Sequence, residues 1–263
     1  MIGKVALITG SSSGIGAAIA LKLWSLGANV VITGRNEKRI QEVVNKCQNR
    51  DNQRALGMRA DLLVDKDIEQ LVAKTIKEFG KIDILVNNAG IGTTVQLNDQ
   101  KYIETFDEIF KTNVRCIQVL TKLVVPYLEI TKGNIINVSS FEGLRPNPVT
   151  MVYCMAKSAL DMFTKCLALS LGPKGIRVNS VNPAAIRTPI FFTVTENDKM
   201  LDCVEKYCKT AYPLRRIGEP EEVAELVAFL ASDTTASFIT GALIPIDGGS
   251  LRADLSAIDY INL

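Results

Sequence analysis

The sequence predicts an α/β protein built on a doubly wound, mostly parallel sheet of seven strands, with helices on both faces. Three observations predict this class. Short β-rich runs alternate along the chain with segments of helical period. Most of these runs are apolar at consecutive positions, such as Ile84-Leu85-Val86, as in strands covered on two sides. No linker or repeat interrupts the alternation, so we expect a single domain over residues 1–263.

The β-rich runs predict the strands. They are Val5–Thr9, Asn29–Thr33, Arg54–Ala60, Ile82–Asn87, Asn134–Ser139, Arg177–Asn182 and Leu243–Asp247. Apolar residues at helical spacing predict the helices between them. The clearest such stripes are Ile15, Ile19, Leu23 and Leu26; Ile40, Val43, Val44 and Cys47; Ile68, Leu71, Val72 and Ile76; and Phe106, Ile109, Phe110, Val114 and Ile117.

Local signals predict where several helices begin and end. Asp65 or Asp67 is a suitable N-cap for the third helix, and Gly80 lies just past its end. Pro126 is expected to kink or end the long fourth helix. Glu219-Pro220-Glu221-Glu222 predicts the start of a late helix, with proline in the first turn and acids at the positive end of the dipole.

Residues 188–212 depart from the alternation. This segment contains Phe191, Phe192, Met200, Leu201, Val204 and Tyr207. Insertions near the carboxyl ends of strands commonly form lids or pockets in such folds. Two interpretations remain open for it, a lid over an apolar substrate and a plain surface helix.

Composition excludes several classes of function. The 263 residues include 30 Lys plus Arg and 28 Asp plus Glu, giving a net charge of +2, and no histidine. Ser-His-Asp catalysis and histidine metal sites are therefore excluded. The charge balance does not indicate nucleic-acid binding, and no apolar run approaches the length of a membrane span.

The cysteine pattern bears on metal binding and location. The six cysteines form no CxxC motif and no cluster with metal-ligand spacing, so we expect no metal site. Met1 leads almost directly into the apolar run Val5-Ala6-Leu7-Ile8, which leaves no room for a leader peptide. We therefore expect reduced thiols and a cytoplasmic location.

A glycine-rich loop between the first strand and first helix predicts a phosphate-binding site. It reads Thr9-Gly10-Ser11-Ser12-Ser13-Gly14-Ile15-Gly16. Small residues let the backbone approach a pyrophosphate, and the helix N-terminus attracts its negative charge. The spacing differs from the commonest dinucleotide fingerprint, G-x-G-x-x-G, and a tight turn without a ligand is the alternative.

Arg35 predicts which dinucleotide binds. In these folds an acid about 20 residues past the glycine loop bonds the ribose 2′-hydroxyl of NAD. Here Gly34 or Arg35 occupies that place. An arginine fork would hold a 2′-phosphate, which a carboxylate would repel. We therefore expect NADP(H) in preference to NAD(H), the alternative being that Arg35 is a solvated surface charge.

A tyrosine and a lysine provide proton chemistry without histidine. Tyr153 and Lys157 are four residues apart, so on a helix they share one face. A nearby ammonium lowers the pKa of a phenol. Such a pair alone is weak evidence, but this one follows Ser140, at the end of the fifth predicted strand, and a loop from Phe141 to Val149.

With these motifs on the chain, the sequence resembles the classical short-chain dehydrogenase/reductase family, from Lys4 to about Gly249. The motifs that carry the resemblance are Thr9 to Gly16, Asp61-Leu62, Asn87-Asn88-Ala89-Gly90, Asn113, Ser140, Tyr153 with Lys157, and Pro183 with Thr188. The resemblance implies a Rossmann-type fold and a nicotinamide-dependent oxidoreductase.

The resemblance also implies roles for individual residues. Tyr153 would be the general acid in reduction and the base in oxidation, with Lys157 lowering its pKa and holding the nicotinamide ribose. Ser140 would bond the substrate carbonyl, and Asn113 would hold a water in a proton relay. The expected cofactor-binding residues are Gly10, Ser12, Ser13, Gly14, Ile15, Gly16, Arg35, Asp61, Leu62, Asn88, Tyr153, Lys157, Pro183 and Thr188.

Taken without the resemblance, several of these residues have simpler interpretations. Asp61 could be a helix-capping acid, Asn88 a structural residue at a strand end, and Asn113 an ordinary polar residue of a helix. One departure from the family also matters. Pro183 is followed by Ala184 where the family usually has glycine, and alanine resists positive φ, so the path toward Thr188 could differ.

The leading hypothesis is an NADP(H)-dependent carbonyl reductase, or alcohol dehydrogenase in reverse, with a lipophilic substrate. Reduction of a 3-oxoacyl thioester is the enzymatic alternative, and a catalytically idle NADP-binding scaffold is the non-enzymatic one. The family implies a homotetramer, or a homodimer, packed through the fourth and fifth helices and the C-terminal strand. Leu251 to Leu263 could close a neighbour's site or fray.

Overall fold

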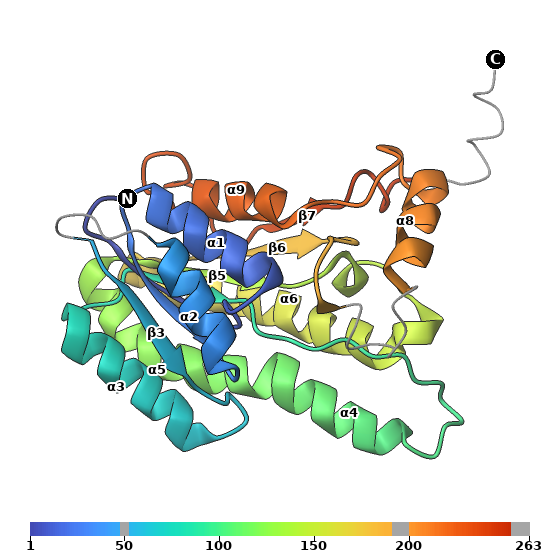
Figure 1. The fold of residues 1–263 in the computed structure, drawn as a ribbon, viewed down its shortest axis with the longest axis horizontal. Helices are drawn as coiled ribbons and strands as arrows, with labels where there is room; N and C mark the ends of the chain where they lie inside the picture. Colours follow the sequence, from blue (N-terminus) through green and yellow to red (C-terminus); the bar gives the residue numbers. More distant parts are fainter. Residues whose placement is uncertain (48–52, 191–199, 254–263) are drawn as a thin grey trace.

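The computed structural model describes residues 1–47, 53–190 and 200–253. Its centre is one parallel sheet, in the order β3-β2-β1-β4-β5-β6-β7 (Figure 1). The strands are β1 (Val5–Ile8), β2 (Asn29–Gly34), β3 (Ala55–Arg59), β4 (Ile84–Asn87), β5 (Asn134–Val138), β6 (Arg177–Pro183) and β7 (Leu243–Ile246). The predicted seven strands are confirmed. The sequence predicted a mostly parallel sheet, and in the structure every pairing between neighbouring strands is parallel.

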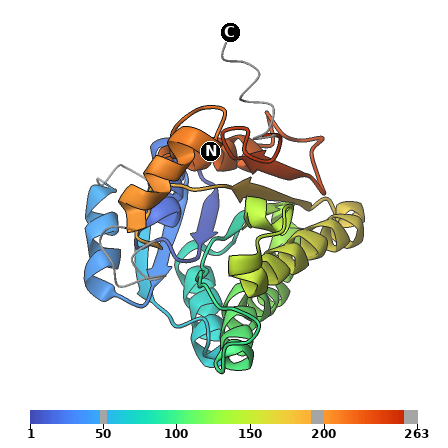
Figure 2. The same cartoon turned by 90° about the vertical axis from the view of Figure 1, so that its right-hand side faces the viewer.

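Helices cover both faces of the sheet (Figure 2). On one face lie α1 (Gly14–Ser25), α2 (Glu37–Lys46) and α9 (Pro220–Ala231), whose apolar side chains share a core with β1, β2 and β6. On the other lie α3 (Asp65–Phe79), α5 (Cys116–Thr131) and α6 (Met151–Leu171), with a second core. This two-sided burial explains why the strands are apolar at consecutive positions. The predicted doubly wound α/β class is confirmed.

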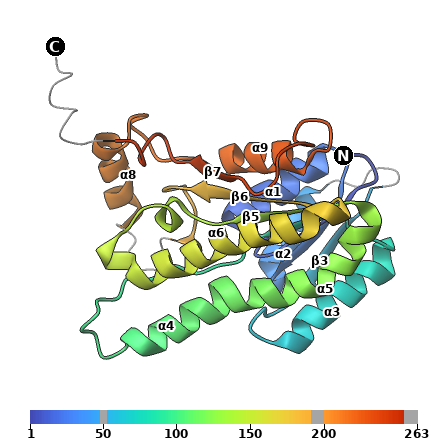
Figure 3. The ribbon, with the colours of Figure 1, turned by 180° about the vertical axis from the view of Figure 1, so that it is seen from behind.

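Among the described residues, two further helices lie on the carboxyl-end side of the sheet. Helix α4 (Tyr102–Phe110) packs against α6 through Ile109 and Val152. Helix α8 (Met200–Ala211) packs on the segment after β6 through Cys208 and Ala211. Figure 3 shows α6 running alongside α4 and α5. No helix in the described part of the chain is long and apolar enough to cross a membrane.

Some helix boundaries differ from the sequence predictions. Neither Asp65 nor Asp67 caps α3, because Val64 is the N-cap and Asp65 is already helical. The Asp67 carboxylate instead accepts a hydrogen bond of 2.9 Å from the Asp61 backbone N–H. Helix α5 continues through Pro126 to Thr131, so the proline does not end it. By contrast, α9 starts at Pro220 as predicted, with Glu219 and Glu222 forming a capping box.

The predicted fourth helix is two α-helices joined by a π-helical turn. Helix α4 ends at Phe110, the π turn covers Lys111–Arg115, and α5 begins at Cys116. The π turn contains Asn113, whose side chain is fully buried. The extra residue of the π turn thus occurs at a fully buried polar position of this long helical segment, and π turns of this kind are frequent at functional sites.

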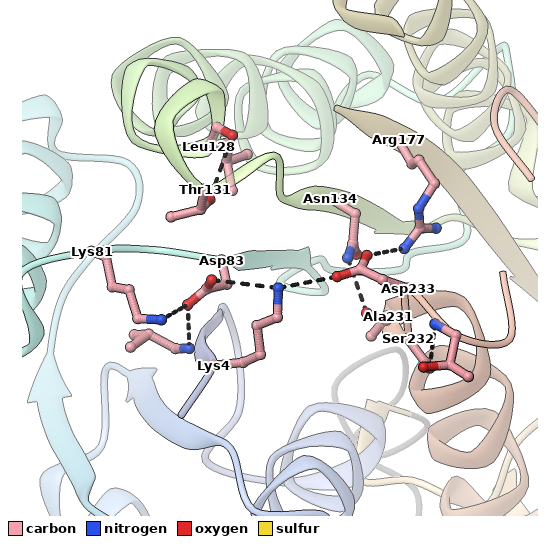
Figure 4. A network of polar contacts seen from close by, with 12 residues as sticks. Lys4, Lys81, Asp83, Leu128, Thr131, Asn134, Arg177, Ala231, Ser232 and Asp233 are labelled. Carbon is pink, nitrogen blue, oxygen red and sulfur yellow. Dashed lines mark hydrogen bonds and ion pairs between the residues drawn. The ribbon is translucent and has the colours of Figure 1, made fainter. Parts of the chain in front are cut away.

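Ion pairs join the strands at their amino ends (Figure 4). The Asp83 carboxylate is 3% exposed, accepts a hydrogen bond from the Val5 N–H at 2.8 Å and pairs with Lys81 at 3.0 Å. Lys4 lies between Asp83, at 3.7 Å, and Asp233, at 3.0 Å. These residues precede β1 and β4 or follow α9. The network therefore stabilises the amino ends of the strands, opposite to the cavity described next.

Candidate active site

A cavity of about 740 Å³ lies at the carboxyl ends of the strands. Residues following β1, β2, β4, β5 and β6 line it, together with the N-terminus of α1 and the first turns of α6. Strand order reverses between β1 and β4, since the chain runs from β1 to β2 and β3 on one side and continues with β4 on the other. Ligands of open α/β sheets bind at such a switch point.

The cavity brings together nearly all the residues that the sequence singled out. Those lining it are Gly10, Ser12, Ser13, Gly14, Ile15, Gly16, Arg35, Asp61, Leu62, Asn88, Ser140, Tyr153, Lys157, Pro183 and Thr188. Asn113 is the exception, because it is fully buried behind the cavity wall.

The start of α1 is built to receive an anion. Ser13 is its N-cap but makes no capping hydrogen bond with its side chain, and no acid stands in the first turn. The backbone N–H groups at this positive helix end therefore remain available on the cavity side. A Cβ on Gly16 would lie 2.4 Å from the Gly10 carbonyl oxygen, so only glycine permits this tight path. The loop fits the pyrophosphate of a dinucleotide.

Asn88 joins the ends of β1 and β4. Its Nδ2 donates hydrogen bonds to the carbonyl oxygens of Thr9, at 2.8 Å, and Gly10, at 3.1 Å. The Thr9 hydroxyl in turn accepts bonds from the backbone N–H groups of Asn88 and Ala89, at 2.9 and 3.0 Å. Asn88 thus fixes the floor of the cavity as well as lining it, in line with the structural interpretation of its position.

Two arginines border the cavity past the end of β2. Arg35 is exposed there, and Arg39, on the first turn of α2, lines the same end. The side chain of Asn36 accepts a bond of 3.0 Å from the Arg39 N–H and so caps α2. Sequence reasoning missed Arg39, although its position four residues after Arg35 was an available signal. Nearby, Asp61 caps no helix, and its Oδ1 accepts a 3.0 Å bond from Leu63 N–H.

Tyr153 and Lys157 lie on one face of α6 beside Ser140. The Lys157 Nζ is 5.5 Å from the centroid of the Tyr153 ring and donates a 2.9 Å hydrogen bond to the Val138 carbonyl. Burial lowers the pKa of Lys157 to about 8, and the negative charge of Asp161 opposes this. The Ser140 side chain accepts a 3.1 Å bond from the Glu142 N–H, which holds the hydroxyl at the end of β5.

The pKa of Tyr153 differs from the expectation that Lys157 lowers it. Burial raises the pKa of Tyr153 above its usual value, and the negative charge of Glu142 raises it further. Hydrogen bonding to Ser140 acts in the opposite direction. The effect of burial on the pKa of Tyr153 outweighs that of the nearby Lys157, because the Lys157 ammonium points to the Val138 carbonyl. The phenol is therefore held in its protonated form, the form of a general acid.

The Asn113 side chain hydrogen-bonds to the backbone beside Lys157. Its Oδ1 accepts a 2.9 Å bond from the Ile91 N–H, and its Nδ2 donates a 2.8 Å bond to the Ile91 carbonyl. A Cβ on Gly90 would lie 3.1 Å from the Asn113 Oδ1 and 3.7 Å from the Lys157 Nζ. The glycine therefore lets the π turn and α6 approach the same point of the chain.

Asp161 is a buried carboxylate that sequence reasoning missed. The Asn182 Nδ2 donates to both of its oxygens at 3.0 Å, and the same amide donates to the Ser140 carbonyl at 3.0 Å. Asp161 thus connects α6 to β6 and to the segment that bears Ser140. The signal was present, because positions 153, 157 and 161 repeat at the spacing of one helix face.

The predicted lid is described in part. Phe191 and Phe192 lie outside the described residues. On α8, Met200, Val204 and Tyr207 line the cavity, whereas Leu201 belongs to a cluster with Cys208. Among the described residues other than glycine, only Lys132 and Arg215 have positive φ, so Ala184 follows Pro183 without backbone strain.

Comparisons with known proteins agree with this geometry. Residues 10–250 match a family model described as Enoyl-(Acyl carrier protein) reductase. The chain is 36% identical to 3-oxoacyl-[acyl-carrier-protein] reductase FabG of Thermotoga maritima, covering 94% of this chain and 97% of the other. It is 34% identical to L-fucose dehydrogenase of Bos taurus, covering 94% and 89%.

Solved structures are similar over nearly the whole chain. One is a short-chain dehydrogenase/reductase of unknown function from Caenorhabditis elegans with cofactor, with a TM-score of 0.91, 33% identity and coverage of 97% of this chain and 98% of the other. Another is 3-ketoacyl-(acyl-carrier-protein) reductase from Brucella melitensis complexed with NADH, with a TM-score of 0.84, 36% identity and coverage of 95% and 98%.

Proposed function

This chain belongs to the short-chain dehydrogenase/reductase family of oxidoreductases, and on that premise we propose that it transfers hydride between NADP(H) and a carbonyl or secondary alcohol of a lipophilic substrate. The observation that carries the proposal is the grouping of Ser140, Tyr153 and Lys157 in one cavity with the uncapped N-terminus of α1. That grouping supports a carbonyl and a dinucleotide side by side.

The chain's own residues supply the proton chemistry. The chemistry that a nicotinamide would supply when bound is hydride transfer, to the carbonyl carbon in reduction and from the carbinol carbon in oxidation. The Tyr153 phenol gives its proton to the carbonyl oxygen, and the Ser140 hydroxyl hydrogen-bonds to that oxygen. The Lys157 ammonium stabilises the phenolate that remains, until a proton from solvent restores the phenol. Asn113 positions the backbone next to Lys157, where the relay water expected from the family would bind.

Two guanidinium groups support NADP(H) in preference to NAD(H). Arg35 and Arg39 border the end of the cavity at β2, where the adenosine ribose of a dinucleotide on α1 would lie. Arginine binds phosphate oxygens bidentately. Asp61 and Leu62, at the end of β3, would flank the adenine.

An apolar wall supports a lipophilic substrate. Ile186 follows β6, and Met200 and Val204 lie on α8; all three line the cavity. We propose that the 188–212 segment, which is described at residues 188–190 and 200–212, is the lid over this substrate end, within a single catalytic domain spanning residues 1–263.

Exposed apolar side chains support an oligomer. Met155, Met162 and Leu169 stand seven residues apart on α6 and are 39%, 57% and 82% exposed. Residues at this spacing form one stripe along a helix, which a second copy of the chain could cover, as in a homodimer or homotetramer. A cytoplasmic location is part of the proposal, and the cysteines of the described residues are free thiols, in keeping with it.

A specific observation favours one alternative substrate. Two relatives, from Thermotoga maritima and Aquifex aeolicus, are named as 3-oxoacyl-[acyl-carrier-protein] reductases. Reduction of a 3-oxoacyl thioester would use the same proton chemistry. The idle scaffold is disfavoured, because a protein that only binds a dinucleotide has no need to bury an ammonium beside a phenol.

Turnover with a panel of substrates tests the function. We expect NADPH oxidation with lipophilic ketones, and activity confined to acyl-carrier thioesters would favour the alternative. Tyr153→Phe should keep cofactor affinity and lower kcat by about 10²- to 10⁴-fold, because it removes the proton donor and little else. Fluorescence titration with NADPH checks the affinity. Substantial remaining turnover would remove Tyr153 from this role, and NADPH binding without turnover in the wild type would indicate a scaffold.

A further inference from the structure

Glu142 places a carboxylate in the cavity next to the proton donor. It lies on the 3₁₀ turn Phe141–Gly143, directly after Ser140, and its side chain lines the cavity. The Asn147 Nδ2 donates a 2.7 Å hydrogen bond to its Oε1, and the Thr150 hydroxyl donates a 2.8 Å bond to its Oε2. The carboxylate is thus held at the start of α6, one turn before Tyr153.

The carboxylate has capacity for a further donor. Each oxygen accepts one of the two bonds above, whereas a carboxylate has about four acceptor sites in all. No ion pair formed by the described residues includes Glu142. A half-buried anion without a cation gains from each hydrogen bond that a ligand donates to it.

The position of the Glu142 carboxylate indicates where on the substrate its hydrogen-bond donor lies. Glu142 is close enough to Tyr153 for its charge to act on the phenol, and its own backbone N–H bonds the Ser140 side chain. Ser140 and Tyr153 hold the reacting oxygen in the proposed function. A substrate group that reaches Glu142 while that oxygen is bound would therefore lie close to the reacting carbon.

We propose that Glu142 selects substrates that carry a hydroxyl group on the carbon next to the reacting carbonyl or carbinol, an inference that rests on the proposed function. A hydroxyl fits better than an ammonium, because Lys157 and Arg145 also line the cavity and would repel a cation. The apolar wall at Ile186, Met200 and Val204 takes the rest of the molecule. The preferred substrate is amphiphilic, a vicinal diol or α-hydroxy ketone with an apolar remainder.

Matched alcohols test this directly. Oxidation with NADP⁺ is measured for cyclohexanol against trans-cyclohexane-1,2-diol, and for 1-phenylpropan-1-ol against 1-phenylpropane-1,2-diol. We expect the wild type to have a kcat/KM about tenfold or more higher for at least one diol, the size expected for a hydrogen bond to a charged acceptor. Glu142→Gln should reduce that ratio toward one. Loss of the charge also lowers the pKa of Tyr153, but this affects both alcohols alike and cancels in the ratio.

Matched controls separate the possible failures. Glu69→Gln makes the same change on an exposed face of α3, away from the cavity, and should keep the wild-type ratio. This inference alone would be overturned if the wild type oxidised the simple alcohols but showed no preference for a diol. A diol-to-alcohol ratio that stays unchanged in Glu142→Gln would also overturn it. A preference for 2-aminocyclohexanol over the diol would do the same. Absence of turnover with every alcohol and ketone would overturn the proposed function and this inference with it. The wild-type comparison decides even if the variant does not fold.

Discussion

The proposed preference for NADP(H) depends on a single charge, that of Arg35. We expect Arg35→Asp to reduce the ratio of kcat/KM for NADPH to that for NADH by about 100-fold, because the change replaces a phosphate-binding cation with a repelling anion. Steady-state rates with both cofactors measure the ratio. Lys38→Asp, on an exposed residue of α2 outside the cavity, makes the same charge change and should leave the ratio unaltered. An unaltered ratio in Arg35→Asp itself would make Arg35 a surface charge only.

Asp161 is expected to influence the titration of Lys157. Burial lowers the pKa of Lys157 to about 8, and the negative charge of Asp161 keeps it from falling further. Asp161→Asn removes that charge, so the pKa of Lys157 should drop below 8. The ammonium would then be lost earlier as the pH rises, and the alkaline limb of kcat/KM for reduction should move to lower pH.

A pH profile separates this effect from a structural one. A merely structural role for Asp161 would lower the rate at every pH without moving the limb. Asp107→Asn, on an exposed residue of α4, should leave the profile as in the wild type. A limb that stays in place or moves to higher pH in Asp161→Asn would contradict the assignment.

Residue-scale prediction from sequence succeeded where backbone spacing fixes the result. Tyr153 and Lys157 share a helix face because of their separation, and Ser140 lies beside them because it follows β5 at the carboxyl end of the sheet. Glu142 was missed because the irregular loop from 141 to 149 has no period from which the direction of a side chain could be read. The pKa of Tyr153 was misjudged because burial, which a sequence does not display, outweighs the neighbouring ammonium.

The helical segment from α4 to α5 shows what periodicity can and cannot predict. Its apolar stripe predicted a long helix correctly. The π turn at Lys111–Arg115 was not predictable, because one extra residue in a turn barely disturbs the stripe. The cause is tertiary, since Asn113 turns inward to bond both backbone groups of Ile91. The N-cap of α3 was mispredicted for a similar reason, as Asp67 bonds to Asp61 rather than to its own helix.

Replacement of Asn113 tests how far this turn depends on its side chain. Asn113→Leu removes both partners of Ile91 and should lower the free energy of unfolding by about 2 kcal/mol, the cost of leaving partly buried backbone groups unpaired. The shift of the urea midpoint measures this. Gln118→Leu makes a similar change on an exposed position of α5 and should stay within about 0.5 kcal/mol of the wild type. Equal midpoints for Asn113→Leu and the wild type would show that the turn forms without the amide.

At the scale of the whole molecule, the amino ends and the carboxyl ends of the strands have different functions. The carboxyl ends carry the cavity, and the amino ends carry the ion pairs of Lys4, Lys81, Asp83, Arg177 and Asp233. The sequence predicted the first through its motifs. It did not predict the second, because these charges are far apart in the chain and only the strand order brings them together.

Asp83→Asn should separate stability from activity. The buried carboxylate loses its charge while Lys4 and Lys81 remain, and since both lysines are partly exposed we expect a loss of about 2 kcal/mol in unfolding free energy. At a temperature where the variant is folded, kcat/KM should equal that of the wild type. Asp65→Asn breaks an exposed ion pair with Arg115 and should destabilise the fold far less than Asp83→Asn does. A large fall in kcat/KM for Asp83→Asn would show that the two ends of the strands are coupled.

The hydrogen bonds of Asn88 have a consequence for how a dinucleotide is received. The Asn88 amide bonds Thr9 and Gly10 and so links β1 to β4 beyond their last backbone hydrogen bond, at the point where the two strands separate. The floor of the cleft is therefore assembled when the chain folds, and its conformational entropy is lost at that stage rather than during association. A dinucleotide bound there would meet a preformed surface, and recognition of its phosphates would depend on fit to that fixed shape.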